Sequence, residues 1–524
     1  MTFLSVTFLL FLAASLVLYY LLPKKFQWII LLAAGAVFYL WGGVKTAGYL
    51  AFSIAVTYAA GLGLEALNRR RGTIPKNDKA RLDANKRARK AVCAAAILLN
   101  FGMLYMLKYF GFTEEIVVGL VRALGGSWNP PTVSFLLPLG VSFYVFQSTG
   151  YVIDQYRGKY PAEHNPAKFA LFVSFFPQMV QGPISRFDSL APQLFGGHDL
   201  RAENLRDGIL RFMWGCFKKM VIADRAAVAV SAFFAESGAY SGSVTAFSVL
   251  LYCINLYADF SGGIDMTVGA ARMFGITLDE NFRRPIFATS LSEYWRRWHI
   301  TLGGWMRDYV FYPLSLSPAF TKLGRWGRKH LGGRVGKILH TSAATFVVYF
   351  LIGLWHGANF RYIAYGFLNG LIITSSLLLA DVYADWRKKL HVKADSTGWR
   401  LFGMARTSLI VFFGRYITRS PRLLTAFSLI GRTFADFRIG DLFSGVPLSL
   451  GLGVGDYLII ALSTAAVLVV EYIEEKHDQP MTDVLAEQSG LVQWIVMAAL
   501  MTALLLFGIF RGSYIASEFI YMQY

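Results

Sequence analysis

Two histidines in unlike surroundings are the residues of this chain best suited to chemistry. His356 lies in the segment LWHGAN (354–359), between two apolar runs. A titratable side chain is costly to place inside a bilayer, so its presence there indicates a functional site. His299 ends the aromatic and basic segment WRRWH (295–299). Because imidazole exchanges a proton near neutral pH, either ring is a candidate general base.

The residues around His299 predict a short amphipathic helix at a membrane interface. Region 279–313 is too charged to span a bilayer, yet it is rich in the aromatic residues that favour the headgroup level. Ser290 or Ser292 can cap such a helix, with Glu293 in its first turn.

The spacing within this helix predicts which of its side chains lie on the same face. Trp295, Trp298 and His299 stand at i, i+3 and i+4, so we expect them on one helix face. Arg296 and Arg297 then point elsewhere. These arginines fit an interfacial anchor, or a cationic, aromatic-lined mouth for a phosphate-bearing donor at the cytoplasmic side.

His356 has polar and conformationally special neighbours. Trp355 precedes it, and Asn359 supplies a hydrogen-bonding group one turn further on. Gly353 and Gly357 permit close helix packing or a break in the helix. A satisfied core histidine is the alternative to a catalytic one.

Two carboxylates and one unusual backbone segment complete the set of candidates. Asp308 is placed to pair with one of the two arginines of the WRRWH segment. Asp259, in the segment DFSG (259–262), can orient a histidine, pair with an arginine or cap a helix. The segment FPQMVQGP (176–183) predicts a broken, re-entrant backbone that lines a cavity.

The chemistry of these candidates argues against a metal site. No two histidines have ligand spacing, and Cys93, Cys216 and Cys253 are expected to pack in apolar runs. Polar groups in a membrane also mark transport paths, so a non-enzymatic polysaccharide or lipid exporter is the alternative class. The chain lacks the intramembrane carboxylate series and the paired interrupted helices that favour a transporter.

Transmembrane helices must hold these residues in place. Hydrophobic residues make up 55% of the 524-residue chain and charged residues 16%. We predict a polytopic all-α membrane protein with about eleven transmembrane helices, plus re-entrant and interfacial helices. The stretch 169–182 is too short to cross and is expected to be a re-entrant or interfacial segment. The expected spans are 2–22, 26–43, 46–67, 91–111, 133–153, 208–235, 243–259, 341–355, 361–380, 450–472 and 491–511, with 403–433 as a further candidate.

Basic residues set the expected orientation. The loop 68–90 holds ten Lys and Arg residues against two Asp, which indicates a cytoplasmic loop and not a nucleic-acid partner. Counting back from this loop puts Lys24 and Lys25 inside and the N-terminus outside. The basic regions 283–337 and 387–422 are expected at the cytoplasmic face.

Taken together, the motifs resemble the membrane-bound O-acyltransferases, in particular the bacterial branch that serves alginate O-acetylation and teichoic acid D-alanylation. The resemblance is densest from residue 130 to 380, and the two histidine motifs, about sixty residues apart, are its most specific part. The matching stretches are FPQMVQGP (176–183), DFSG (259–262), 281–285, EYWRRWHITLGGWMRDYVFYPL (293–314) and LWHGAN (354–359).

This resemblance implies a single membrane domain with helices in a ring around a thinned centre and a tunnel through it. Residues 1–130 would form N-terminal helices, 131–380 the catalytic core, and 381–524 the C-terminal helices and an aromatic tail. His356 matches the family's catalytic histidine and His299 its second histidine, which is asparagine in some branches.

The same resemblance implies supporting residues and a carrier. Asn281 lies in one of the matching stretches and is a candidate supporting residue. The tail 519–524 is similar to an aromatic motif whose tyrosine is thought to carry the acyl group, so Tyr521 is a candidate acyl carrier. The alternative is an aromatic residue at a membrane boundary.

The hypothesis is therefore a membrane O-acyltransferase of the bacterial cytoplasmic membrane. It would move an acyl group, with acetyl favoured, from a cytoplasmic thioester to an extracellular or cell-wall polysaccharide. His356 would act as general base, and Asn359, Trp355 or His299 would donate to the oxyanion. No tightly bound cofactor is expected: acetyl-CoA or an acyl-carrier protein would be the donor, and an extracellular SGNH-type acyltransferase the partner. D-alanyl transfer to teichoic acid is the alternative.

Overall fold

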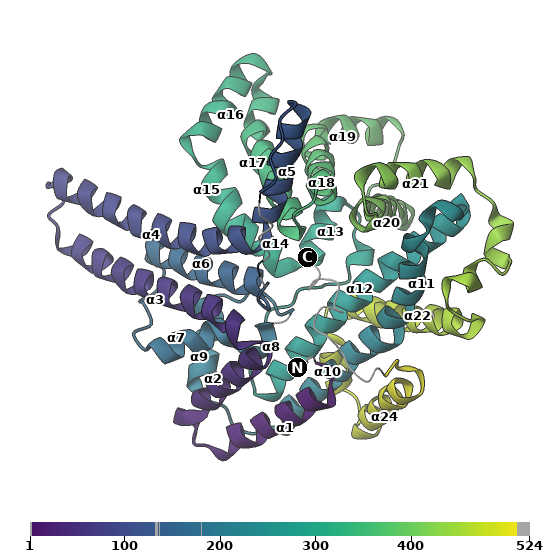
Figure 1. Cartoon of the computed structure of the whole chain (residues 1–524), viewed down its shortest axis with the longest axis horizontal. Coiled ribbons are helices and arrows are strands. Elements are labelled where there is room, and N and C mark those ends of the chain that lie inside the picture. The colour runs from purple at the N-terminus through teal and green to yellow at the C-terminus, as the bar shows by residue number, and fades with distance from the viewer. Residues whose placement is uncertain (1–2, 131–134, 136, 180, 511–524) are drawn as a thin grey trace. The chain divides into compact units, whose positions relative to one another are not determined.

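Helices account for the regular structure of the described chain. The computed structural model describes residues 3–130, 135, 137–179 and 181–510 (Figure 1). Within these ranges the one β-type pairing is an isolated bridge between Phe282 and Trp298. The predicted all-α class is confirmed.

Six of the described helices are long and apolar enough to cross a membrane, as expected for a multi-pass membrane protein. A seventh candidate is the pair α18 (Phe360–Leu378) and α19 (Ala380–Lys389), bent by 61° at its break. The count of about eleven spans stays a prediction. The six are α3 (Val44–Thr73), α4 (Lys79–Lys108), α12 (Gly242–Met273), α17 (Gly333–His356), α22 (Val454–His477) and α24 (Gly490–Phe507).

The chain divides into two compact units. The first runs to Phe212 and includes Met266–Asp279, and the second includes Met213–Asp265 and the described chain from Glu280 onward. Besides α3 and α4, the first unit contains α1 (Val6–Leu21), α2 (Lys24–Trp41), α5 (Phe110–Ala123), α6 (Val141–Arg157), α7 (Pro166–Ser174), α8 (Phe176–Met179), α9 (Phe187–Gly196) and most of α10 (Ala202–Cys216).

In the first unit α3, α4 and α6 pack along one another (Figure 1). Leu64 and Val152 are fully buried between them. Asn100 is also fully buried, and it accepts a hydrogen bond from Ser53 at 2.5 Å and donates to Thr57 at 3.3 Å. These three polar side chains therefore satisfy one another, as a low-dielectric interior requires.

The basic region 68–90 is mostly helical, and its prediction as a loop is wrong. Helix α3 continues to Thr73 and α4 begins at Lys79, so the connection is short. Lys and Arg are good helix formers, and Asp78 caps α4 by accepting the Arg81 backbone N–H at 3.0 Å.

The predicted break in the re-entrant segment is confirmed. Helix α7 ends at Ser174 and α8 is a single turn that begins at Phe176. The Gln178 side chain donates to the Gln147 carboxamide oxygen at 3.2 Å, and both line a small cavity.

The second unit holds both histidines. In it α17 and α18 pack against each other, and the expected span 403–433 is two helices separated at Ser420–Arg422 (Figure 1). The expected span 208–235 contains a π-helical stretch, η1 (Phe217–Ala223). The other helices are α11 (Asp224–Ala235), α13 (Leu291–Arg297), α14 (Ile300–Met306), η4 (Arg307–Phe311), α15 (Tyr312–Ser315), α16 (Pro318–His330), α20 (Thr397–Arg419), α21 (Leu423–Ala435) and α23 (Met481–Ala486), with short 3₁₀ turns at Ser237–Ala239 (η2), Pro285–Phe287 (η3), Ile439–Phe443 (η5) and Pro447–Leu450 (η6).

Candidate active site

Helix α13 carries the WRRWH segment but is shorter than its pattern predicts. The Ser290 hydroxyl accepts the Glu293 backbone N–H at 3.2 Å, which confirms one of the two predicted caps. The helix ends before Trp298, whose backbone is extended. The prediction that Trp295, Trp298 and His299 share one helix face is therefore wrong.

A local antiparallel pairing is the reason that the helix stops. Trp298 pairs with Phe282, and the Ile300 N–H donates to the Asn281 carbonyl at 3.1 Å. His299, between them, has φ 48° and ψ 53°. This left-handed conformation is uncommon for residues other than Gly, Asn, Asp and His. The turn leaves the His299 ring 2% exposed, next to Asn281.

Asn281 determines which nitrogen of His299 carries the proton. Its Oδ1 accepts the Thr301 backbone N–H at 3.0 Å and the Thr301 hydroxyl at 2.7 Å. A backbone N–H can only donate, so the atom that faces it is the oxygen. The same oxygen lies 3.4 Å from His299 Nδ1, which therefore carries the hydrogen and leaves a lone pair on Nε2. Burial lowers the pKa of His299 to about 3, so the ring is neutral.

His356 is the last residue of α17, and two glycines bring it close to α18. A Cβ on Gly357 would lie 2.6 Å from Cε2 of Tyr362, and a Cβ on Gly353 would lie 2.5 Å from the Tyr362 carbonyl oxygen. Both predicted roles, close packing and the helix break, are confirmed. Asn359 caps α18 by accepting the Arg361 N–H at 3.0 Å.

The indole of Trp355 lies close to both histidines. Its ring centroid is 5.5 Å from that of His299 and 4.9 Å from that of His356. Both imidazoles are buried, at 2% and 9% exposed. Two groups able to accept or donate a proton are thus held near one aromatic ring, His299 by the turn before α14 and His356 by the end of α17, although about sixty residues separate them in sequence.

Aromatic packing fixes the WRRWH side of this arrangement. Trp298 stacks on Tyr294 at 5.6 Å and meets Phe282 edge-on at 5.0 Å. The Trp295 indole N–H donates to the Asn369 side chain on α18 at 3.1 Å. Trp295 and Trp298 therefore hold the segment in place, and Asn369 is a supporting residue that the sequence analysis did not identify.

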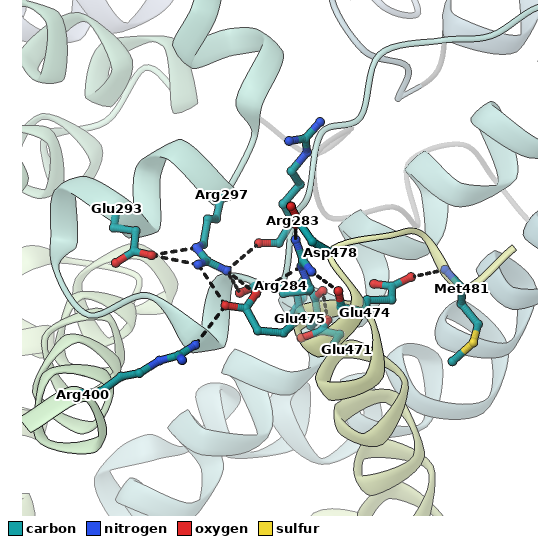
Figure 2. Close-up of polar contacts among 11 residues, drawn as sticks. Arg283, Arg284, Glu293, Arg297, Arg400, Glu471, Glu474, Glu475, Asp478 and Met481 are labelled. Carbon is teal, nitrogen blue, oxygen red and sulfur yellow. Dashed lines mark hydrogen bonds and ion pairs between the residues drawn. The ribbon is translucent and has the colours of Figure 1, made fainter. Parts of the chain in front are cut away.

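Arg297 is already paired with carboxylates, as Figure 2 shows. Its guanidinium contacts Glu293 at 2.9 Å and donates to both oxygens of Glu475 at 2.9 and 3.2 Å. Glu475, on α22, also pairs with Arg284 at 3.3 Å and Arg400 at 3.1 Å. Hydrogen bonds from Thr289 and Arg297 more than offset the burial of the Glu293 carboxyl, so the pKa of Glu293 is lowered.

The other charged candidates have different surroundings. Arg296 is exposed and makes no ion pair with a described residue. The prediction that Asp308 pairs with Arg296 or Arg297 is wrong, because its carboxylate accepts from its neighbour Arg307 at 2.9 Å. The cause is local, since the π-helical turn η4 puts the two adjacent side chains within reach.

Asp259 is an interior residue of α12, which continues to Met273, so helix capping is wrong. Its carboxylate accepts from Lys219 Nζ at 2.6 Å, and Asp224 accepts from the same amine at 2.9 Å. All three side chains are at most 5% exposed. This buried pairing links α12 to η1 and α11, and the sequence pattern gave no sign of it.

Tyr521, the candidate carrier, lies outside the described residues. Among the described residues no three His, Cys, Asp or Glu side chains are grouped as metal ligands would be. The absence of a metal and of a tightly bound cofactor stays a prediction.

Tyr365 and Arg415 are near the histidines but were not predicted. The ring of Tyr365 lies 6.5 Å from that of His356, and its hydroxyl is 3.5 Å from Arg415. Arg415 belongs to the basic region 387–422, yet it is only 6% exposed. Its position directly after the apolar run IVFFG (410–414) was the available signal that it differs from a solvent-facing loop arginine.

Comparison with known proteins supports the sequence motifs. Residues 160–326 match the model of the membrane-bound O-acyltransferase family. The chain is 32% identical to a probable alginate O-acetylase of Pseudomonas syringae over 89% of this chain and 81% of that protein. It is 30% identical to a peptidoglycan O-acetyltransferase of Helicobacter pylori over 55% of each chain. It is 26% identical to a teichoic acid D-alanyltransferase of Bacillus subtilis over 55% of this chain and 70% of that one.

Proposed function

The chain belongs to the membrane-bound O-acyltransferase family, and on this basis we propose that it serves the O-acetylation of an extracellular or cell-wall polysaccharide. The protein is an O-acyltransferase that crosses the membrane several times. Acetyl is the favoured group because the relatives named for O-acetylation are 30–33% identical to this chain, against 26% for those named for D-alanylation.

The observation that carries the mechanism is the placement of both histidines against Trp355. His356 acts as general base and takes the proton of the acceptor hydroxyl while its oxygen attacks the thioester carbonyl. The carbon–oxygen bond forms, the carbon–sulfur bond breaks, and the proton passes from His356 to the leaving thiolate. No net proton is released, so the reaction needs no separate proton path.

His299 has a different role, because its ring is neutral and its Nδ1 hydrogen faces Asn281. A neutral imidazole cannot neutralise a phosphate, but its Nε2 lone pair can accept a hydrogen bond from a substrate hydroxyl or amide. We assign His299 to the positioning of substrate and His356 to proton transfer.

The donor approaches from the cytoplasmic side, where positive charge is concentrated. Arg296 is exposed and free of ion pairs with the described residues, so it is the arginine of the WRRWH segment best placed to meet a phosphate. Arg297 holds the segment in place instead. Acetyl-CoA or an acyl-carrier protein is the donor in this proposal, and the N-terminus of the chain lies outside the cytoplasmic membrane of a bacterium.

The acyl group leaves on the far side. Tyr521 is proposed to accept it, and an extracellular SGNH-type acyltransferase to finish the transfer to the polysaccharide. The basis for both steps is the similarity of the C-terminal motif.

Substitution of His356 in the full-length chain tests the proposal. Cells that lack the native gene receive the wild-type chain, His356→Ala or His198→Ala, and are fed labelled acetate or labelled D-alanine. We expect alkali-labile acetate in the cell envelope with the wild-type chain and none with His356→Ala at equal protein level. His198 is partly exposed and bonds to Tyr19, so His198→Ala is the control for loss of a histidine.

Two outcomes would contradict the proposal. Normal acetate incorporation with His356→Ala would remove the assignment of the base. Incorporation of D-alanine in place of acetate would move the chain to the alternative acyl group. An exporter would instead change the amount of polysaccharide outside the cell.

A further inference from the structure

Arg415 is a buried cation that no carboxylate of the described residues balances. Its side chain comes from α20 and is 6% exposed. Nη2 donates to the Tyr294 hydroxyl at 2.9 Å, and Nη1 to the Tyr365 hydroxyl at 3.5 Å. The guanidinium also lies over the rings of Trp298 at 5.2 Å and Tyr365 at 6.0 Å. No carboxylate of the described residues is within ion-pair distance of it.

Such an arrangement is costly unless the charge is used. A buried charge loses its hydration, and cation–π contacts and neutral hydrogen bonds recover only part of this free energy. A hydrophobic side chain of similar size would pack there at less cost. A buried cation of this kind therefore fits a site where negative charge forms transiently during a reaction.

The hydrogen-bond directions indicate how Arg415 acts. A guanidinium has donors only, so both tyrosine hydroxyls must accept from it. Each hydroxyl hydrogen is then left to donate to another atom, and the adjacent positive charge makes it a stronger donor. The arginine in effect presents two polarised phenol groups.

Of the two phenols, Tyr365 is the one that contacts the catalytic histidine. Its ring centroid is 6.5 Å from that of His356. Gly414, next to Arg415, lets α20 pack closely against the Tyr365 ring, because a Cβ there would lie 2.9 Å from Cε2 of Tyr365. The Tyr294 ring instead stacks on Trp298.

We propose that the Tyr365 hydroxyl, held and polarised by Arg415, donates a hydrogen bond to the oxyanion of the acyl-transfer intermediate. This inference rests on the proposed function. When the acceptor oxygen bonds to the thioester carbon, the carbonyl electron pair moves onto oxygen, and Tyr365 stabilises that charge without giving up its proton. The pair returns when the thiolate leaves with the proton held by His356. Arg415 touches no reacting atom and is a positioning residue.

Variants of the full-length chain in the acetate-labelling assay test this inference. Tyr365→Phe keeps the ring and removes the donor, so we expect the initial rate to fall about 10²-fold. Tyr416→Phe is the matched control, because Tyr416 is also buried, follows Arg415 on α20 and bonds to Thr433 at 2.9 Å. It should leave the rate unchanged.

The Arg415 variants separate positioning from structural support. Arg415→Met should lower the rate by a similar factor while the melting temperature of the purified protein stays equal or rises. Arg415→Lys restores the charge and should recover part of the rate. A merely structural arginine would lower the melting temperature in Arg415→Met, with no recovery in Arg415→Lys.

The results that overturn the inference are distinct from those that overturn the function. A Tyr365→Phe rate equal to that of Tyr416→Phe would remove Tyr365 from the mechanism while the His356→Ala result stands. A loss of rate in Tyr362→Phe alone would also remove Tyr365 from the mechanism, because the ring of Tyr362 lies 6.4 Å from that of His356. An unchanged rate in His356→Ala would instead overturn the proposed function, and this inference with it.

Discussion

The second unit handles positive charge in two opposite ways. Around Glu475, three guanidiniums (Arg284, Arg297 and Arg400) meet three carboxylates (Glu293, Glu475 and Asp478), so the charges balance (Figure 2). At Arg415, one guanidinium is held by tyrosine hydroxyls and aromatic rings.

This difference separates structural support from reactivity. A balanced network has no charge left for a substrate, and it ties the WRRWH segment to α20 and α22. An unbalanced cation contributes little to stability but stabilises negative charge that forms during a reaction. The ion-pair network therefore fixes the position of the segment, and the aromatic region around His356 provides the chemistry.

Glu475→Ala should have the largest effect on stability. It removes the carboxylate that three arginines share, two of them less than a fifth exposed, so we expect a loss of about 3 kcal/mol. The melting temperature in detergent measures this. Asp478→Ala is the control, because Asp478 pairs with Arg284 but is 91% exposed. Equal losses of melting temperature in Glu475→Ala and Asp478→Ala would show that the ion-pair network does not stabilise the fold as a buried cluster.

The second prediction concerns the region of the two histidines and uses the pH dependence of the free energy of unfolding. The folded-state pKa of His299 is about 3 and its ordinary value is 6.5, so the unfolded chain binds a proton that the folded chain does not. Stability therefore falls as the pH drops below 6.5, on the order of 1 kcal/mol for each pH unit. His299→Asn should lose this dependence.

The difference between the wild-type chain and His299→Asn from pH 6.5 to 4.5 isolates this effect, because groups such as His198, whose pKa burial also lowers, titrate in both proteins. The pKa of Glu293 is lowered below its usual value, and its protonation therefore destabilises the fold only at still lower pH. An equal change of melting temperature with pH in the wild-type chain and in His299→Asn, over this window, would show that the ring is not buried as a neutral base.

Arg297→Lys should have an intermediate effect. Lysine keeps the charge but cannot donate to both oxygens of Glu475, so we expect a loss of about 1.5 kcal/mol. The melting temperature should fall between those of the wild-type chain and Glu475→Ala. Acetate incorporation at permissive temperature should persist, and its complete loss at full protein level would mean that Arg297 also binds donor.

Arg400→Ala should have the smallest effect. Its side chain is 55% exposed, and solvent screens its pair with Glu475, so we expect about 0.5 kcal/mol or less. A loss of stability in Arg400→Ala as large as that in Arg297→Lys would show that the pair between Arg400 and Glu475 is part of the buried support.

Local patterns predicted much of the fold and site. Composition and long apolar runs identified the membrane class, and the serine cap, the broken segment after Ser174 and the glycines beside His356 all followed from residue type. Composition identified the basic regions, although helix propensity and the Asp78 cap turned most of 68–90 into helix.

Long-range pairing was not predictable, because nothing local encodes it. The isolated bridge to Phe282 ended α13 early and removed His299 from its face. Likewise, the acidic end of α22 gave no sign that Glu475 pairs with arginines far away in sequence. Arg415 was grouped with loop arginines because charge counting ignores burial.

The left-handed backbone at residue 299 narrows the routes by which this site can evolve. A β-branched or bulky apolar residue would be strained at φ 48°, whatever its chemistry. Asparagine tolerates that backbone and keeps a hydrogen-bonding group at the distance of an imidazole nitrogen. In the genetic code the codons of histidine and asparagine differ by one base. A lineage could thus exchange the two in a single step without first rebuilding the turn.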